Sequence, residues 1–137
     1  MRPLLFVPAL LVLLACEGGE RREAERLADA IVRFRHASNA EEPATAADLR
    51  KVSCTTEDVC RTRDTCLVAA DGIAKALRLK NEVEKGIADL DAGKLSLDDA
   101  QSLPQKLDEA DRVLKDGYTA LPACDTQLAA LKKRYRF

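Results

Sequence analysis

Residues 89–99 read DLDAGKLSLDD, and this short segment between two long amphipathic stretches decides the fold. Gly93 is typical of the residue that follows a helix C-terminus. Ser96 followed by acidic residues is typical of the start of the next helix, where carboxylates oppose the positive helix end. We therefore expect the chain to reverse direction here, between a helix that ends at about Asp91 and a helical segment that begins at about Ser96.

A calcium site is the alternative interpretation of this segment, because its aspartates and glycine look like the second half of an EF-hand loop. Aligning Gly93 with the glycine that such a loop requires places Ala88, Leu90 and Ala92 at positions of oxygen ligands. It also places Asp99 where the longer Glu should bind in a bidentate way. Shifting the frame to use the aspartates misplaces the glycine, so the sequence favours a capped turn between helices.

A long helix is predicted before the turn, from about Thr56 to Asp91. Thr56 is a candidate N-cap, and acidic residues occupy the first turn. Apolar residues recur at spacings of three and four, which predicts one buried stripe. The stripe consists of Val59, Cys66, Ala70, Ile73, Leu77, Val83, Ile87 and Leu90.

After the turn, the helical pattern continues to Arg134, with interruptions at Pro104, Gly117 and Pro122. Since proline is tolerated in the first turn of a helix but not in its interior, we expect at least two helices here, the second starting near Thr119. Their apolar stripes consist of Leu103, Leu107, Ala110 and Leu114, and of Leu121, Cys124, Leu128 and Leu131.

Two further helices are predicted ahead of the hairpin. An amphipathic pattern runs from residue 20 to residue 37, and Pro43 lies in the break that follows it. Thr45 looks like the cap of a short helix that carries Leu49 and Val52, and residues 53–57 are expected to be irregular. No segment reads as a useful strand. The predicted fold class is all-α, a small bundle of four or five helices around a long central antiparallel hairpin.

The cysteines are expected to staple this hairpin with two disulfides. Folding at the turn brings together residues whose numbers sum to about 190 in an antiparallel pair, so Cys66 faces Cys124. Cys60 and Cys66 lie on one helix and point in different directions, which leaves Cys54 to pair with Cys60. Zinc is the competing interpretation, but five residues between cysteines are more than the two to four of ordinary zinc ligand pairs.

Composition excludes several classes of function. The chain has 137 residues, room for one domain, and its 22 Lys and Arg nearly balance its 23 Asp and Glu. A nucleic-acid binder needs a surplus of basic residues, so no nucleic-acid partner is expected. His36, the single histidine, stands near a helix end, where a cation is favourable. We expect no cofactor, no metal and no catalytic residue; acidic pairs such as Asp98-Asp99 and Asp108-Glu109 are typical of a solvated helix surface.

Residues 1–16 read MRPLLFVPALLVLLAC. One basic residue precedes an uncharged run of 13 residues, which is too short for a membrane-spanning helix and typical of a signal peptide. The segment Leu13-Leu14-Ala15-Cys16 resembles the lipobox of bacterial lipoproteins. The alternatives are an ordinary secretory signal or a short buried helix. Five cysteines are an odd number, and lipidation of Cys16 would leave four that pair completely.

The resemblance implies how the chain is processed and where it is held. Residues 1–15 would be the signal peptide, Cys16 would carry the acyl chains, residues 16–20 would form a tether, and residues 21–137 a single helical-bundle domain. We expect the tether to be extended, with a reach of about 14 Å. Glu17 favours the outer membrane over retention at the inner membrane, on the periplasmic face rather than the cell surface.

The C-terminal segment combines basic and aromatic residues. Its basic side chains can stabilise the negative end of a helix, and they can also contact anionic lipid, the cell wall or a protein partner. The residues of this possible contact surface are Lys132, Lys133, Arg134, Tyr135, Arg136 and Phe137.

The sequence as a whole favours a non-enzymatic binding or scaffold module for a protein of the cell envelope. Small helical pilotins of secretion systems have a similar overall plan, although no motif of theirs is present here. The alanine-rich faces at residues 69–76 and 120–130 are candidate grooves for a helical segment of the partner. The alternatives are an enzyme acting on cell-wall glycan, an inhibitor of one, and a structural spacer.

Overall fold

The computed structural model describes residues 13–137, with side chains from Gly18 onward. The predicted signal peptide lies largely outside the described residues, and the side chain of Cys16 is not among those described. The described part is helical, without strands, which confirms the all-α prediction. Its helices are α1 (Leu13–His36), α2 (Glu42–Lys51), α3 (Glu57–Asp91), α4 (Leu97–Ala100) and α5 (Leu103–Tyr135).

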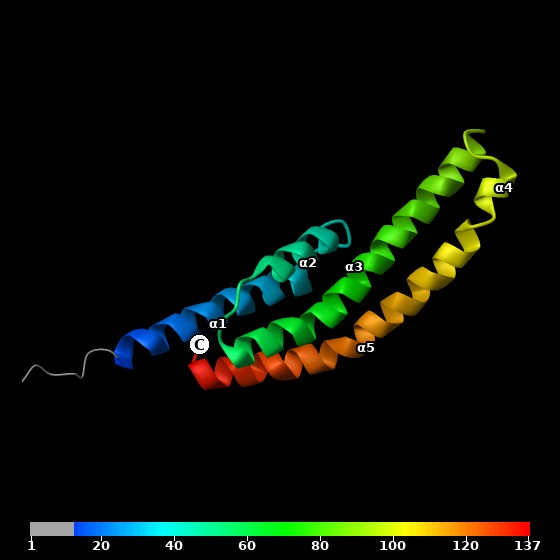
Figure 1. The fold of residues 1–137 in the computed structure, drawn as a ribbon. Helices are drawn as coiled ribbons and strands as arrows, with labels where there is room; N and C mark the ends of the chain where they lie inside the picture. The colour runs from blue at the N-terminus through cyan, green and yellow to red at the C-terminus, as the bar shows by residue number, and fades with distance from the viewer. Residues whose placement is uncertain (1–12) are drawn as a thin grey trace, which may run out of the picture.

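The long hairpin of α3 and α5 is the frame of the molecule. Figure 1 shows the two helices antiparallel and in contact along their length, with the short α4 at the tip. Gly93 ends α3 with φ of 67°, and the hydroxyl of Ser96 accepts a hydrogen bond of 3.1 Å from the backbone N–H of Asp99. The reversal therefore lies where the sequence predicts it, with the expected chemistry on both sides.

Both predicted disulfides are present. Cys66 of α3 is bonded to Cys124 of α5, and Cys54 is bonded to Cys60 at the start of α3. The first bridge fixes the register of the hairpin, and a close approach of two glycines agrees with it. A Cβ atom on Gly72 would lie 3.0 Å from the Cα atom of Gly117.

The prediction of a helix that starts near Thr119 is wrong, because α5 runs without a break through Gly117 and Pro122 and has Pro104 in its first turn. Gly117 is buried where α5 crosses α3, so its missing side chain permits close packing instead of ending the helix. Pro122 lies inside α5 on an exposed face. Packing on both sides of this position holds the helix together although the proline cannot donate its backbone hydrogen bond.

The starts of the first two helices also differ from the prediction. α1 begins at Leu13 rather than near Glu20, so residues 16–20 are helical and not extended. Glycine lowers helix propensity without forbidding a helix, and Gly18 and Gly19 are accommodated in α1. α2 begins at Glu42, with Pro43 in its first turn, where the missing N–H needs no helical partner.

Thr45 is not the cap of α2. Its hydroxyl donates to the backbone carbonyl of Glu42 at 3.1 Å, from a position inside the helix. The turn before α2 is closed instead by the carboxylate of Glu41, which accepts from the backbone N–H and the hydroxyl of Ser38 at 3.0 and 2.7 Å. These hydrogen bonds lower the pKa of Glu41, with the hydroxyl of Ser38 contributing most.

The core lies in one half of the hairpin only. Figure 1 shows α1 and α2 against the half of α3 and α5 that carries the chain's C-terminus. We call residues 76–114, the far end of α3 with α4 and the start of α5, the distal arm, and the remaining described residues the base. The main buried cluster lies in the base and consists of Ala24, Leu27, Ala30, Ile31, Phe34, Ala46, Leu49, Val59, Cys66, Ala70, Ile73, Ala74, Cys124 and Leu131.

The distal arm is a pair of helices without a third layer. Its buried residues are Ala76, Val83 and Ala110. Ile87 and Leu107, which the sequence predicts to be buried, are 50% and 44% exposed. The periodic pattern places both residues toward the hairpin, but no helix covers that face at this distance from the base.

Candidate functional site

The first half of α1 and the C-terminal segment lie together at the base. Glu20 and Arg21 of α1 line a shallow hollow of about 470 Å³ together with Arg134, Tyr135 and Arg136. Figure 1 shows the C-terminus beside the first half of α1. Cys16 precedes Glu20 by four residues of the same helix, a rise of about 6 Å. The expected lipidation position and the basic C-terminal segment therefore belong to the same end of the bundle.

A hydrogen bond and an ion pair hold the C-terminal segment in place. The hydroxyl of Tyr135 donates to Oδ1 of Asp58 at 3.1 Å, and Nη1 of Arg134 lies 3.1 Å from Oδ2 of the same carboxylate. Burial raises the pKa of Tyr135, and the hydrogen bond to Asp58 acts in the same direction. Arg136, in the left-handed conformation, ends α5, and Phe137 is 37% exposed.

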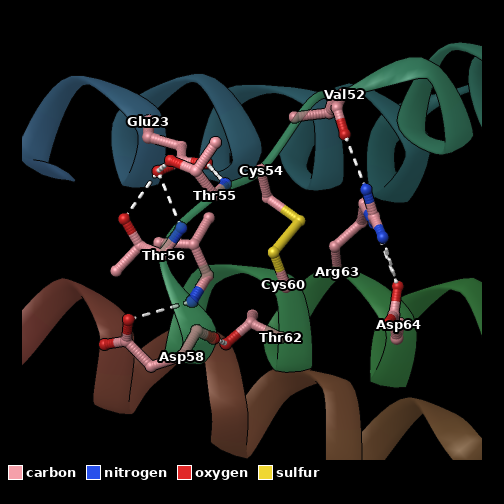
Figure 2. Close-up of a disulfide and its surroundings, with 11 residues drawn as sticks. Glu23, Val52, Cys54, Thr55, Thr56, Asp58, Cys60, Thr62, Arg63 and Asp64 are labelled. Atoms are coloured by element: carbon pink, nitrogen blue, oxygen red, sulfur yellow. Dashed lines mark hydrogen bonds and ion pairs between the residues drawn. A yellow bond between two sulfur atoms is a disulfide. The ribbon is translucent and has the colours of Figure 1, made fainter. Parts of the chain in front are cut away.

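A buried carboxylate connects α1 to the start of α3, as Figure 2 shows. Glu23 is 5% exposed and accepts hydrogen bonds from the backbone N–H and hydroxyl groups of both Thr55 and Thr56. Burial alone would raise the pKa of Glu23, but the hydrogen bonds outweigh it, so the pKa is lowered. Thr56 occupies the predicted N-cap position, yet its hydroxyl donates to Glu23 at 2.6 Å and does not cap α3.

The irregular segment before α3 is held at two further points (Figure 2). The Cys54–Cys60 bridge ties it to the first turns of α3. The guanidinium of Arg63 donates to the carbonyl of Val52 at 3.1 Å. The segment, which links α2 to α3 along the chain, is thus fixed to both α1 and α3. Its polar contacts stabilise the fold.

The distal arm carries an apolar strip on one face. Leu77, Leu107 and Leu114 line a small apolar hollow of about 50 Å³ with Ala76 and Ala110. Lys80 and Asp111 stand at its edge, so the strip carries one charge of each sign. The hollow is far too small for a ligand by itself, but it marks a groove between the two helices.

The predicted alanine-rich groove at residues 69–76 is not available to a partner. Ala69, Ala70 and Ala74 are at most 2% exposed, because neighbouring helices already fill the face at residues 69–76. Ala129 and Ala130, at the other predicted groove, point to solvent. The small side chains at residues 69–76 allow close packing within the base and do not form a groove for a partner.

The remaining candidates lie on exposed helix surfaces. Glu109 is paired with Lys75, and this hydrogen bond lowers its pKa. Asp98, Asp99 and Asp108 are exposed, and His36 lies in the last turn of α1. Among the described residues, no group of three His, Cys, Asp or Glu side chains is arranged to hold a metal ion.

No helix between residues 13 and 137 is sufficiently long and apolar to cross a membrane.

Sequence reasoning missed the role of Glu23. The residue stands four positions before Leu27 and so shares the apolar face of α1, which was a detectable signal. Its partners, however, come from 32 and 33 residues further along the chain.

Comparison with protein-family models, with curated proteins and with solved structures finds no match for this chain.

Proposed function

We propose that this protein is a lipid-anchored protein of the bacterial cell envelope that binds a helix of another envelope protein, without enzymatic activity. The lipid is carried by Cys16, on the periplasmic face of the outer membrane. The observation that carries the binding proposal is the apolar strip of the distal arm, which continues the face that α1 and α2 cover in the base.

The spacing of leucines on α5 supports this continuity. Leu107, Leu114, Leu121 and Leu128 recur every seven residues and so share one side of the helix. Leu114, Leu121 and Leu128 pack against the core of the base, whereas Leu107 is 44% exposed. The same side of α5 is therefore covered from Leu114 onward and open at Leu107.

An amphipathic helix is the occupant that this groove fits. In the base, the groove between α3 and α5 receives α1, an amphipathic helix with Leu27, Ile31 and Phe34 on its buried side. A partner helix with the same type of apolar stripe would extend that layer over the arm. Lys80 and Asp111 favour a partner with an acidic and a basic residue beside its stripe.

Crosslinking in intact cells tests the binding proposal. A photo-reactive amino acid at position 107 should capture a partner protein, and the same amino acid at the exposed position 105 should not. Leu107→Glu should abolish copurification of that partner, while the matched variant Gln105→Glu should leave it unchanged. Equal capture from positions 105 and 107 would contradict the proposal.

Metabolic labelling with a fatty-acid analogue tests the anchor. The natural chain should be labelled and Cys16→Ser should not. The double variant Cys54→Ser/Cys60→Ser removes two cysteines that form a disulfide, so its labelling should equal that of the natural chain. Undiminished labelling of Cys16→Ser would refute lipidation at this position.

A further inference from the structure

The C-terminal segment and the tip of the hairpin carry opposite charge. At the base, Lys132, Lys133 and Arg136 lie within the last six residues, and Arg21 of α1 lines the same hollow as Arg136. At the tip of the distal arm, residues 89–99 contain four aspartates and one lysine. This polarity lies along the length of the hairpin (Figure 1), with the C-terminus at one end and α4 at the other.

We infer that the basic C-terminal segment docks on the phosphate head groups of anionic phospholipids and holds the hairpin upright, with α4 pointing away from the membrane. This inference rests on the proposed lipidation of Cys16, which would place the same end of the bundle at the bilayer. It adds an orientation that a lipid anchor alone does not impose.

Among the described residues, Lys132, Lys133 and Arg136 form no ion pair at the base, whereas two other cations do. Arg21 pairs with Glu25 at 2.8 Å and Arg134 with Asp58 at 3.1 Å. Arg136 lines the hollow at this end, and Glu20 is the carboxylate that shares the hollow with it. Guanidinium groups suit phosphate because their donors match its oxygens in pairs. Basic residues at an anionic bilayer surface each add to its affinity, and their effect is screened by salt.

Two geometric features suit the segment to a lipid surface. The hydrogen bond from Tyr135 to Asp58 fixes the last turn of α5, so the residues after it project from a rigid support. Phe137 is 37% exposed, and an aromatic ring is favoured at the level of the head groups. The 35 residues of α3 span about 52 Å, so an upright hairpin would carry α4 far from the bilayer.

Vesicle binding of an unlipidated chain tests the inference separately from lipidation. The chain from residue 16 onward, with Cys16→Ser, retains every buried residue that the structure describes. It should bind vesicles of phosphatidylcholine with phosphatidylglycerol, bind pure phosphatidylcholine vesicles weakly, and dissociate as salt rises. Neutralising Lys132, Lys133 and Arg136 to Gln should weaken binding to the anionic vesicles at least about 10-fold.

The matched control removes three cations elsewhere. Lys85, Lys94 and Lys115 are exposed lysines away from the C-terminal segment, and their change to Gln alters the net charge equally. We expect this triple variant to bind within about twofold of the parent chain. An equal loss of affinity for anionic vesicles in the two triple variants, or no loss in either, would overturn the inference. The labelling result at Cys16 would not be affected.

Fluorescence quenching tests the orientation. The chain contains no tryptophan, so Phe137→Trp and Leu97→Trp each introduce a single reporter, one at each end of the molecule. Brominated phosphatidylglycerol in the vesicles should quench the reporter of Phe137→Trp and leave that of Leu97→Trp unchanged. Equal quenching at both positions, or stronger quenching at position 97, would overturn the upright orientation.

Discussion

The base and the distal arm use the same two helices with different support. In the base, α1 and α2 lie over the hairpin, both disulfides are present, and Leu27, Ile31 and Leu49 are fully buried. In the arm, α3 and α5 have only each other and the short α4. The same periodic pattern thus gives a core where a third layer is present and an exposed apolar strip where it is not.

This contrast gives each region a separate task. A small chain with few aromatic residues has a small free energy of unfolding, and the interactions that provide it lie mainly in the base. The arm can then leave Leu107 and Ile87 partly exposed without loss of the fold. In the proposed function, the base is the part that the membrane holds and the arm is the part that a partner covers.

The largest expected effect comes from breaking the bridge that fixes the hairpin in the base. Cys66→Ala/Cys124→Ala opens a crosslink between residues 58 positions apart and should lower the free energy of unfolding by about 4 kcal/mol. Urea unfolding of the variant and the parent chain measures the difference.

The short bridge is the control for this experiment. Cys54→Ala/Cys60→Ala opens a crosslink of only six positions, and the expected loss is about 2 kcal/mol in the same chain-entropy model. A larger loss for the short bridge than for the long one would contradict the role given to Cys66–Cys124.

Truncating a leucine to alanine should lower the free energy of unfolding by different amounts in the two regions. Leu27→Ala removes a side chain that is fully buried in the base and should cost about 2–5 kcal/mol. Leu107→Ala removes one that is 44% exposed in the arm and should cost less than about 1 kcal/mol. Thermal unfolding followed by circular dichroism compares them, and equal losses would refute the division into a supported base and an open arm.

Two glycines of α3, one in the base and one in the arm, allow the packing of the two regions to be compared by adding a single methyl group. A Cβ at Gly72 would meet backbone atoms of α5, the Cα of Gly117 and the carbonyl oxygen of Val113, both at 3.0 Å. Gly72→Ala should therefore destabilise the protein by about 1–2 kcal/mol, because overpacking outweighs the gain in helix propensity.

Gly86→Ala is the matched variant in the arm. Its Cβ would meet the end of the Leu103 side chain, which can rotate away where no third helix confines it. Stability should change by less than about 1 kcal/mol, since this movement offsets part of the helix-propensity gain. Urea unfolding checks both variants, and a larger loss at position 86 than at position 72 would contradict the packing described.

The last expected effect is a pH dependence of stability in the base. The pKa of Glu23 is lower in the folded protein than its ordinary value of 4.5, so its carboxylate stabilises the fold above that value. This contribution should be lost as the pH falls below 4.5 and through the lowered pKa. Glu23→Gln should cost about 1–3 kcal/mol at pH 7 and progressively less at lower pH. A cost that stays constant down to pH 2 would show that ionisation is not the cause.

Much of the fold could be predicted because it depends on spacing within one hairpin. A single turn at Gly93 sets which residues of α3 and α5 face each other, and this register alone pairs Cys66 with Cys124. Helix ends were predicted less well. Pro43 and Pro122 read as interruptions in the sequence, yet one lies in a first turn and the other inside a helix that packing holds together.

Other features depend on contacts that no local pattern contains. The partners of Glu23 lie on another segment, and the exposure of Ile87 follows from where α1 and α2 end in space. The basic C-terminal segment was visible in the sequence, but its position beside the start of α1 required the fold.

The mass of the mature protein extracted from bacterial membranes tests the central claim most directly. The account predicts a chain that begins at Cys16, carries acyl chains on that residue, and contains no free thiol because Cys54, Cys60, Cys66 and Cys124 are paired. Extracted protein that still begins at Met1, or that begins at Cys16 without added lipid mass, would contradict it.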